Sequence, residues 1–183
     1  MDDEQMRART LMLSFVLLAS FFSFGSIHNV RVSAEPSTPQ GLSGIDGTYH
    51  AFAEVEADLQ TLASNYPNIA KLISIGKTHE GRDIWAIKIS DNPQVEEDEP
   101  EVYYNGAHHA REWMTTEVSM CLINALVENY TSDVAIKDIV DTRQLWIIPV
   151  VNPDGRVYDG GDDPSNFMNW RKNRRNNGDG TYG

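Results

Sequence analysis

The sequence predicts an α/β fold in which a mixed β-sheet is sandwiched by helices. Segments with helical spacing of apolar residues alternate with short runs rich in β-branched and aromatic residues, and this alternation is typical of helices packed on a sheet. The run RQLWIIPVV at 143–151 is almost entirely apolar, which predicts a central strand covered on both faces. Two further runs, at 71–78 and 82–90, are separated only by the residues HEG, so we expect an antiparallel hairpin.

The remaining elements follow from periodicity and from turn residues. A helix is expected at about 50–66 and ends before Pro67. An acidic loop at 95–99 precedes a strand at 100–107, which leads into a long helix at about 112–130. A short helix at 133–140 then precedes the central strand. The predicted buried residues of the first helix are Phe52, Val55, Leu59, Leu62 and Tyr66, and those of the long helix are Val118, Cys121, Leu122, Ala125 and Leu126.

Composition restricts the classes of partner. The chain has 183 residues and a formal net charge of -12, which argues against nucleic acid or an anionic membrane as the main partner. The basic run WRKNRR at 170–175 is therefore not expected to be a nucleic-acid patch. Cys121 is the single cysteine, so no internal disulfide is possible, and its place in the helical stripe predicts a core residue.

The N-terminal residues have the pattern of a secretory signal. Two arginines precede an apolar run from Leu11 to about Gly25, and the small residues VSA at 32–34 suit cleavage near Ala34. The run is short for a membrane span, which needs ~20 apolar residues. We therefore expect a signal peptide at 1–34, a linker at 35–48 rich in Ser, Pro and Gly, and a secreted domain at 49–183 with no stable membrane span. An uncleaved signal anchor is the alternative.

The stretch NGAHHAREWMTTE at 105–117 carries a candidate metal site. His109 and Glu112 are three residues apart, so at a helix start their side chains are neighbours that can converge on one zinc ion. His108 with Glu112 is the rival pair. Successive side chains at the end of a strand point to opposite sides, so only one histidine is expected to face an ion. A surface histidine and glutamate at a helix N-terminus is the plain alternative.

Three ordered motifs, GAHHAREW, NPDG and WRKNRR, resemble the zinc carboxypeptidases of the carboxypeptidase A type, which are metallo-exopeptidases acting on peptide C-termini. The segment 49–90 is most similar to the carboxypeptidase T branch, and the resemblance covers residues 49–183. It implies that His109 and Glu112 are zinc ligands and that Arg111 contacts the substrate peptide. It also implies that Arg171 binds substrate and polarises the scissile carbonyl, while NPDG is read as a turn that shapes the cleft. Met168 stands where the family has a further arginine.

The resemblance also implies groups that these residues do not include. The family's site has a third zinc ligand, a histidine, and a glutamate general base, both far downstream. The five histidines here are at 28, 50, 79, 108 and 109. We therefore expect the N-terminal half of a catalytic domain, a truncated fold that binds its one zinc ion weakly and hydrolyses nothing alone.

Three alternatives to the carboxypeptidase reading stay open. The chain could be a cell-wall γ-glutamyl peptidase or a deacylase of the same fold, or it could be a degenerate peptide-binding fragment. Calcium binding at DGGDD, 159–163, or at NNGDG, 176–180, is also possible, although neither run has the regular acid spacing of an EF-hand loop.

Overall fold

A computed structural model describes residues 49–160 and 166–183 of the chain. The predicted signal peptide and linker lie outside these residues, so cleavage near Ala34 stays a prediction. No helix within the described ranges is both long enough and apolar enough to cross a membrane.

The centre of the fold is a four-stranded mixed sheet with the strand order β1-β2-β4-β3. Its strands are β1 (Ala70–Lys77), β2 (Asp83–Ile89), β3 (Glu101–Asn105) and β4 (Gln144–Ile148). Strands β1 and β2 form the predicted antiparallel hairpin, β2 pairs antiparallel with β4, and β3 pairs parallel with β4. The predicted mixed sheet and the central place of the 143–151 segment are therefore confirmed.

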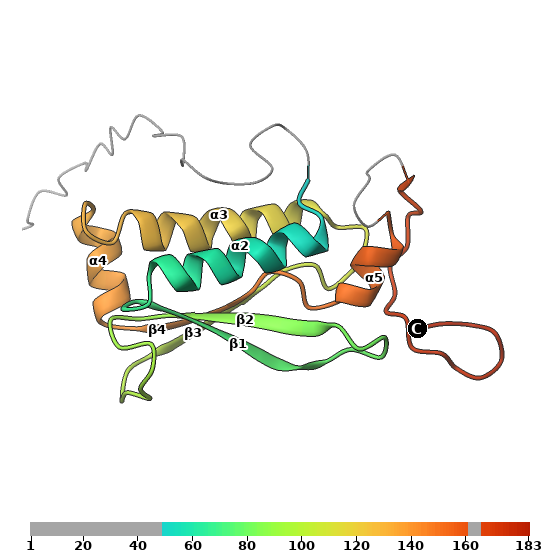
Figure 1. Cartoon of the computed structure of the whole chain (residues 1–183), viewed down its shortest axis with the longest axis horizontal. Coiled ribbons are helices and arrows are strands. Elements are labelled where there is room, and N and C mark those ends of the chain that lie inside the picture. The colour runs from blue at the N-terminus through green and yellow to red at the C-terminus, as the bar shows by residue number, and fades with distance from the viewer. Residues whose placement is uncertain (1–48, 161–165) are drawn as a thin grey trace, which may run out of the picture. The chain divides into compact units, whose positions relative to one another are not determined.

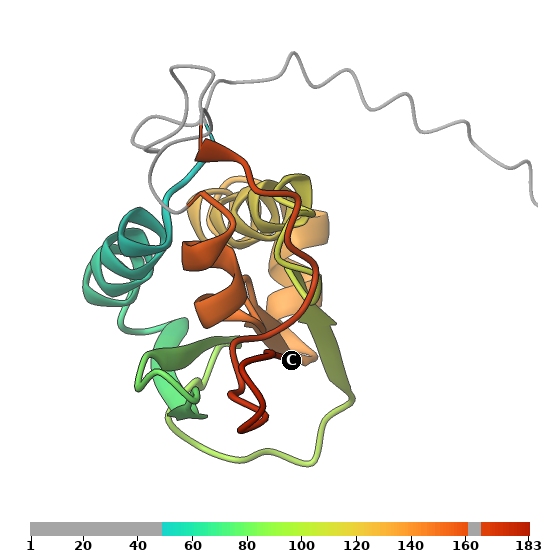
Figure 2. The same ribbon diagram turned by 90° about the vertical axis from the view of Figure 1, so that its right-hand side faces the viewer.

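Two long helices, α2 (Phe52–Asn65) and α3 (Met114–Glu128), lie side by side over one face of this sheet, as both views show (Figures 1 and 2). Helix α2 buries Phe52, Val55, Leu59 and Leu62, as its periodicity predicts. Its first turn is closed by the Glu54 carboxylate, which accepts the Ala51 backbone N–H at 2.8 Å.

The short helices stand at the ends of the sheet (Figure 1). Helix α4 (Val134–Asp141) begins after Asp133, whose side chain accepts the backbone N–H groups of Ala135 and Ile136. Helix α5 (Pro153–Tyr158) is the next element after β4, reached through a short loop, and it has proline in its first turn. This puts α5 at the same end of the sheet as the segment that follows β3.

The buried face of α3 differs from the predicted stripe, and the prediction that Cys121 is a core residue is wrong. Cys121 is exposed and Val118 is 48% exposed, whereas Thr116, Ser119 and Asn124 are buried. Two of these buried polar side chains form hydrogen bonds with the backbone of their own helix. Ser119 donates to the Thr115 carbonyl at 2.7 Å, and Asn124 donates to the Met120 carbonyl at 2.8 Å. A polar face can therefore enter the core. The helix also begins at Met114, two residues later than expected.

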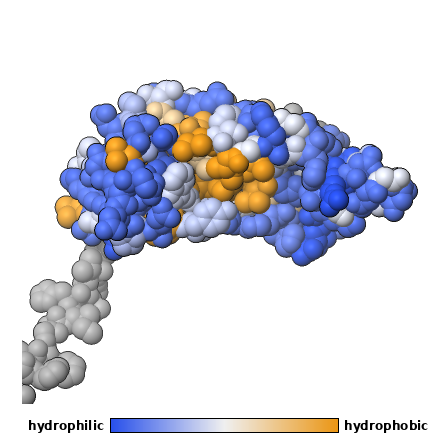
Figure 3. Space-filling model, turned by 90° about the horizontal axis from the view of Figure 1, so that it is seen from below, coloured by the Kyte–Doolittle hydropathy of each residue, from blue (hydrophilic) through white to orange (hydrophobic). Residues whose placement is uncertain are grey.

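The second face of the sheet has no helix over it among residues 49–160 and 166–183 (Figure 1). Apolar side chains gather in the middle of this face (Figure 3), where Ile75, Trp146 and Ile148 help to line a hollow of about 490 Å³. Strand β3 lies at the edge of the sheet, and its Tyr103 is 61% exposed. An apolar face beside an open strand edge is a hazard for aggregation.

Candidate active site

The segment HHARE leaves the C-terminal end of β3 through a strained residue. Ala107 has a φ of 48°, a left-handed conformation that costs a residue with a Cβ atom on the order of 1 kcal/mol. Its N–H donates to the Thr115 hydroxyl at 2.8 Å, and its carbonyl accepts the Asn152 N–H at 3.2 Å. Helix α3 and the loop after β4 therefore hold the turn that directs the next residues across the end of the sheet.

His109 and Glu112 meet in this turn. The Glu112 N–H donates to the His109 carbonyl at 3.0 Å, and the closed turn brings His109 Nδ1 to 2.8 Å from Glu112 Oε1. Their side chains are 35% and 47% exposed, so both can be reached from solvent. The His108 side chain is exposed and has no hydrogen-bond or ion-pair partner among the described residues. Of the two histidines, His109 is thus the one that faces Glu112.

The spacing of these two side chains fits a zinc ion. Ligand atoms about 2.0–2.1 Å from a tetrahedral zinc lie about 3.3 Å apart. His109 Nδ1 and Glu112 Oε1 need to separate by only about half an ångström from their present 2.8 Å. Within the described ranges, however, no further histidine, cysteine or carboxylate completes a group of three ligands with this pair.

The two arginines predicted to bind substrate lie beside the pair. Arg111 donates from Nη1 to the Asn169 side-chain oxygen at 3.0 Å, which links the turn to the segment that carries Arg171. The Ala110 N–H donates to the Arg171 carbonyl at 3.3 Å, so the two segments run next to each other. The Arg171 side chain is exposed and makes no hydrogen bond or ion pair with the described part of the chain. Its guanidinium is therefore available to a ligand.

Asn152, the first residue of NPDG, holds three segments together. Its side-chain Nδ2 donates to the His108 carbonyl at 3.2 Å and to the Lys172 carbonyl at 3.1 Å, and its Oδ1 accepts the Gly155 N–H at 3.0 Å. The prediction that NPDG is a turn is wrong, because Asn152 is the N-cap of α5 and the next three residues form the first turn of that helix. That NPDG shapes a substrate cleft stays a prediction.

The carboxylate of Asp159 also links two segments of the site, and this link was not predicted from the sequence. This residue is 0% exposed and accepts the indole N–H of Trp113 at 2.9 Å and the backbone N–H of Trp170. Trp113 directly follows Glu112, and Trp170 directly precedes Arg171. One buried carboxylate therefore links the turn that carries Glu112 to the segment that carries Arg171. The sequence offered no spacing signal for this, because Asp159 belonged only to the possible calcium run DGGDD.

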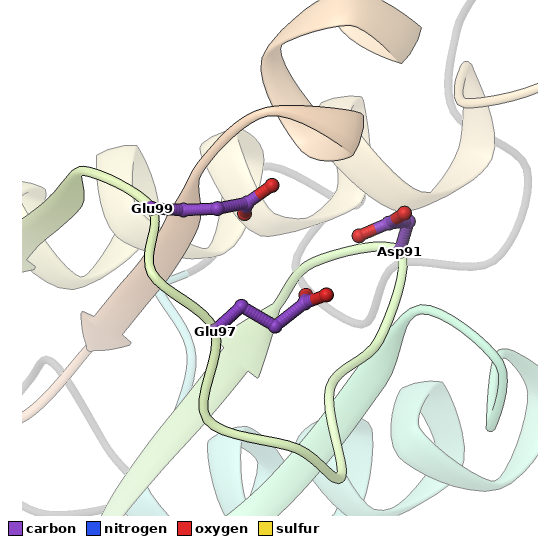
Figure 4. Close-up of side chains that lie close together, drawn as sticks. All are labelled: Asp91, Glu97 and Glu99. Carbon is purple, nitrogen blue, oxygen red and sulfur yellow. The ribbon is translucent and has the colours of Figure 1, made fainter.

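The described residues also contain a cluster of three acidic side chains away from this site. Oxygen atoms of Asp91, Glu97 and Glu99 lie within 4.8 Å of one another in the loop between β2 and β3, and Figure 4 shows the three side chains converging. Burial, together with the charges of Glu97 and Asp91, raises the pKa of Glu99. The sequence predicted only a solvated loop here, because the irregular spacing of these acids matches no ligand pattern.

The two predicted calcium runs do not form such a group among the described residues. In NNGDG the Asp179 carboxylate accepts the N–H and the hydroxyl of Thr181. Most of DGGDD lies outside the described residues. Calcium binding stays a prediction.

The fold and the site together define a class of protein. A histidine and a glutamate converge at the end of a mixed α/β sheet with two arginines beside them, and zinc accepts this pair of donor types. Residues 55–183 match the family model described as zinc carboxypeptidase. The chain belongs to the zinc carboxypeptidase family, which bears out the resemblance seen in its motifs.

Individual relatives agree with this family. The chain is 43% identical over 139 residues to a zinc carboxypeptidase of Saccharothrix mutabilis subsp. capreolus, covering 76% of this chain and 31% of that protein. It is 36% identical over 131 residues to carboxypeptidase D of Anas platyrhynchos, covering 71% of this chain and 9% of that protein. The crystal structure of the carboxypeptidase A from Helicoverpa armigera matches with 31% identity and a TM-score of 0.64, covering 93% of this chain and 37% of that one. The chain thus spans about a third or less of the length of these relatives.

Proposed function

We propose that the chain forms the metal-facing part of a secreted zinc carboxypeptidase, which hydrolyses the C-terminal bond of peptides and proteins. The observation that carries this proposal is the turn after β3, in which His109 Nδ1 and Glu112 Oε1 lie 2.8 Å apart. Arg171 runs alongside, with its carbonyl bonded to the Ala110 N–H. Family membership supports the same reading, because the matched family is defined by zinc and by carboxypeptidase activity.

Each side chain has a distinct task in this proposal. His109 and Glu112 hold the ion, which would supply a bound water of lowered pKa and a Lewis acid for the scissile carbonyl. The Arg171 guanidinium, which has no carboxylate partner among residues 49–160 and 166–183, stabilises the negative charge that develops on the carbonyl oxygen. Arg111 donates to the substrate backbone from a side chain already fixed by Asn169.

A third zinc ligand and a general base complete the site in this proposal, and both come from additional sequence of a longer protein. Two observations support this. No histidine follows His109 in the 183 residues, and the chain covers only 31%, 9% and 37% of the three relatives named above. The chain by itself is then expected to bind zinc weakly and to release no C-terminal residue.

The test is zinc titration of the chain by calorimetry. Because two ligands remain, we expect binding weaker than in a complete three-ligand site, and both His109→Ala and Glu112→Gln should abolish it. His108→Ala is the matched control, since His108 is the adjacent histidine that faces away, and it should bind zinc as the parent does. Loss of zinc in His108→Ala with retention in His109→Ala would overturn the ligand assignment.

A release assay for C-terminal residues accompanies the titration. Tight stoichiometric zinc binding and turnover by the chain alone would overturn the proposal that a ligand and a base are supplied from elsewhere. Absence of turnover in a longer protein that contains this chain and binds zinc tightly would overturn the carboxypeptidase activity itself.

Two further proposals rest on the sequence. Export is proposed from the apolar run after the first arginines and from the small residues before position 35, and N-terminal sequencing of the secreted product should begin near Glu35. Calcium binding is proposed from the acidic runs at 159–163 and 176–180, in addition to zinc binding, and calcium titration in the presence of zinc would detect it.

A further inference from the structure

An open pocket of about 620 Å³ borders the candidate zinc site. Three aromatic side chains, Tyr49, Trp113 and Phe167, form its wall together with Met114. Its polar residues include Glu112 and Arg111. We call this cavity the aromatic pocket. It brings together residues from the start of the described chain, from the turn before α3 and from the segment before Arg171.

The wall of the aromatic pocket combines one fixed ring with exposed apolar side chains. The rings of Tyr49 and Phe167 stand edge-on to Trp113, with centroids 5.7 Å and 5.8 Å from it. Trp113 is 6% exposed, whereas Met114 and Phe167 are 59% and 51% exposed. Large apolar side chains gathered in a concavity, with a few polar groups at one side, are the usual lining of a binding pocket.

Trp113 is a rigid part of this wall. Its indole N–H is held by the buried Asp159 carboxylate at 2.9 Å, and the Arg156 guanidinium stacks on its ring at 3.9 Å from the centroid. A ring fixed from both its edge and its face loses little freedom when a ligand packs beside it. Preformed apolar surface of this kind favours apolar ligands, because binding then costs less ordering of the protein.

The aromatic pocket is continuous with the proposed zinc site. Glu112 lines the pocket and at the same time faces His109 Nδ1 at 2.8 Å. Arg111, also in the lining, keeps N–H donors beyond the one bonded to Asn169, and these suit the carbonyl oxygen of an extended peptide. A ligand whose carbonyl reached the metal would therefore carry a neighbouring side chain to the mouth of the pocket.

We infer that the aromatic pocket is a substrate subsite for an apolar or aromatic side chain on the amino-terminal side of the scissile bond. The inference rests on the proposed carboxypeptidase function. Such an enzyme has a single residue on the carboxyl side of the cut, and that residue must reach groups that bind its terminal carboxylate. The aromatic pocket instead offers aromatic rings and a thioether, its Arg111 is already bonded to Asn169, and the Glu112 carboxylate in its lining would repel a terminal carboxylate. Its ligand is the apolar body of an upstream residue.

The experiment measures peptide binding to the full chain in the presence of zinc, using the fluorescence anisotropy of dye-labelled peptides. One peptide has glycine at the three positions before its C-terminal residue, and three others each carry phenylalanine at one of those positions. Filling an apolar pocket discriminates by about tenfold or more. We therefore expect one phenylalanine position to strengthen binding about tenfold over the glycine peptide.

Variants assign that preference to the aromatic pocket. Phe167→Ala should reduce the advantage of phenylalanine to less than about threefold and leave binding of the glycine peptide unchanged. Met114→Ala is a second, independent change in the same wall. Tyr103→Ala is the matched control, because Tyr103 is also an exposed aromatic residue, 61% against 51% for Phe167, and lies on β3 outside the pocket lining. Circular dichroism verifies that each variant is folded.

The outcomes separate the subsite from the enzyme function. Equal binding of the phenylalanine and glycine peptides by a chain that binds zinc would overturn the subsite. So would a phenylalanine preference that survives in both Phe167→Ala and Met114→Ala. A preference that depends on Phe167 in a chain whose zinc binding is indifferent to His109→Ala would support the pocket and overturn the proposed zinc site.

Discussion

Gly155 offers the sharpest test of how the loops at the end of the sheet are packed. It lies in α5, between Asn152 and the chain at Lys172. A Cβ atom at this position would stand 2.5 Å from Asn152 Nδ2 and 2.6 Å from the Lys172 carbonyl oxygen. We predict that Gly155→Ala destabilises the fold, although alanine is normally the better residue inside a helix.

The magnitude follows from these distances. Ordinary contact begins near 3.4 Å, so the Lys172 carbonyl must move by roughly 0.8 Å. Overpacking of this kind costs about 1–3 kcal/mol. The same shift strains the Asn152 bonds to the His108 and Lys172 carbonyls, each worth about 1 kcal/mol. Helix propensity returns up to about 1 kcal/mol. The expected net loss is about 2–4 kcal/mol.

Urea unfolding followed by circular dichroism measures this loss. The matched control is Ala57→Gly at an exposed interior position of α2, which should cost about 1 kcal/mol through propensity alone. Zinc titration of Gly155→Ala should also show weaker binding, because the His108 carbonyl is one of the groups displaced. A Gly155→Ala chain as stable as the parent, or more stable, would refute the packing argument.

Two further predictions concern His50 and Cys121. The hydrogen bond between His50 Nδ1 and Glu117 Oε2, at 2.5 Å, outweighs burial and raises the pKa of His50, with further help from the charges of Glu117 and Asp58. Stability from protonated His50 is therefore complete below its ordinary pKa of about 6.5 and is lost as pH rises through the raised value. The excess unfolding free energy of the parent over His50→Gln, about 1–3 kcal/mol at low pH, should shrink in urea melts as the pH rises above about 6.5, and a constant difference would contradict the assignment. Cys121 is exposed on α3, so a thiol reagent should label the native chain nearly as fast as the unfolded chain, and protection of the thiol would contradict this exposure.

The elements that the sequence predicted well are those with a local pattern. The buried face of α2 repeats at helical spacing over about three turns, and the hairpin is marked by HEG between two β-rich runs. The pairing of His109 with Glu112 belongs to the same kind of signal, because a spacing of three brings two side chains together in any tight turn. Such features need no knowledge of the rest of the fold.

The features that could not be predicted depend on residues far apart in the sequence, or on polar side chains that form hydrogen bonds with their own helix. The core face of α3 could not be read from hydrophobicity, since Ser119 and Asn124 bond to their own helix and can be buried. The Asp159 carboxylate accepts hydrogen bonds from Trp113 and Trp170, which lie 46 and 11 residues away along the chain. The aromatic pocket draws on positions 49, 113 and 167, a separation that leaves no periodic trace.

The Asn152 side chain has a consequence for the way the site opens. It joins the carbonyls of His108 and Lys172, which are 44 and 20 residues away in sequence, while its own N–H is bonded to Ala107. None of these segments can leave without breaking the bonds of the others, so they form one cooperative unit. The backbone amides of Ala110, Asn152 and Gly155 should then share a single opening free energy in hydrogen exchange. The turn that carries His109 and Glu112 is accordingly either assembled with the segment that carries Arg171 or open together with it.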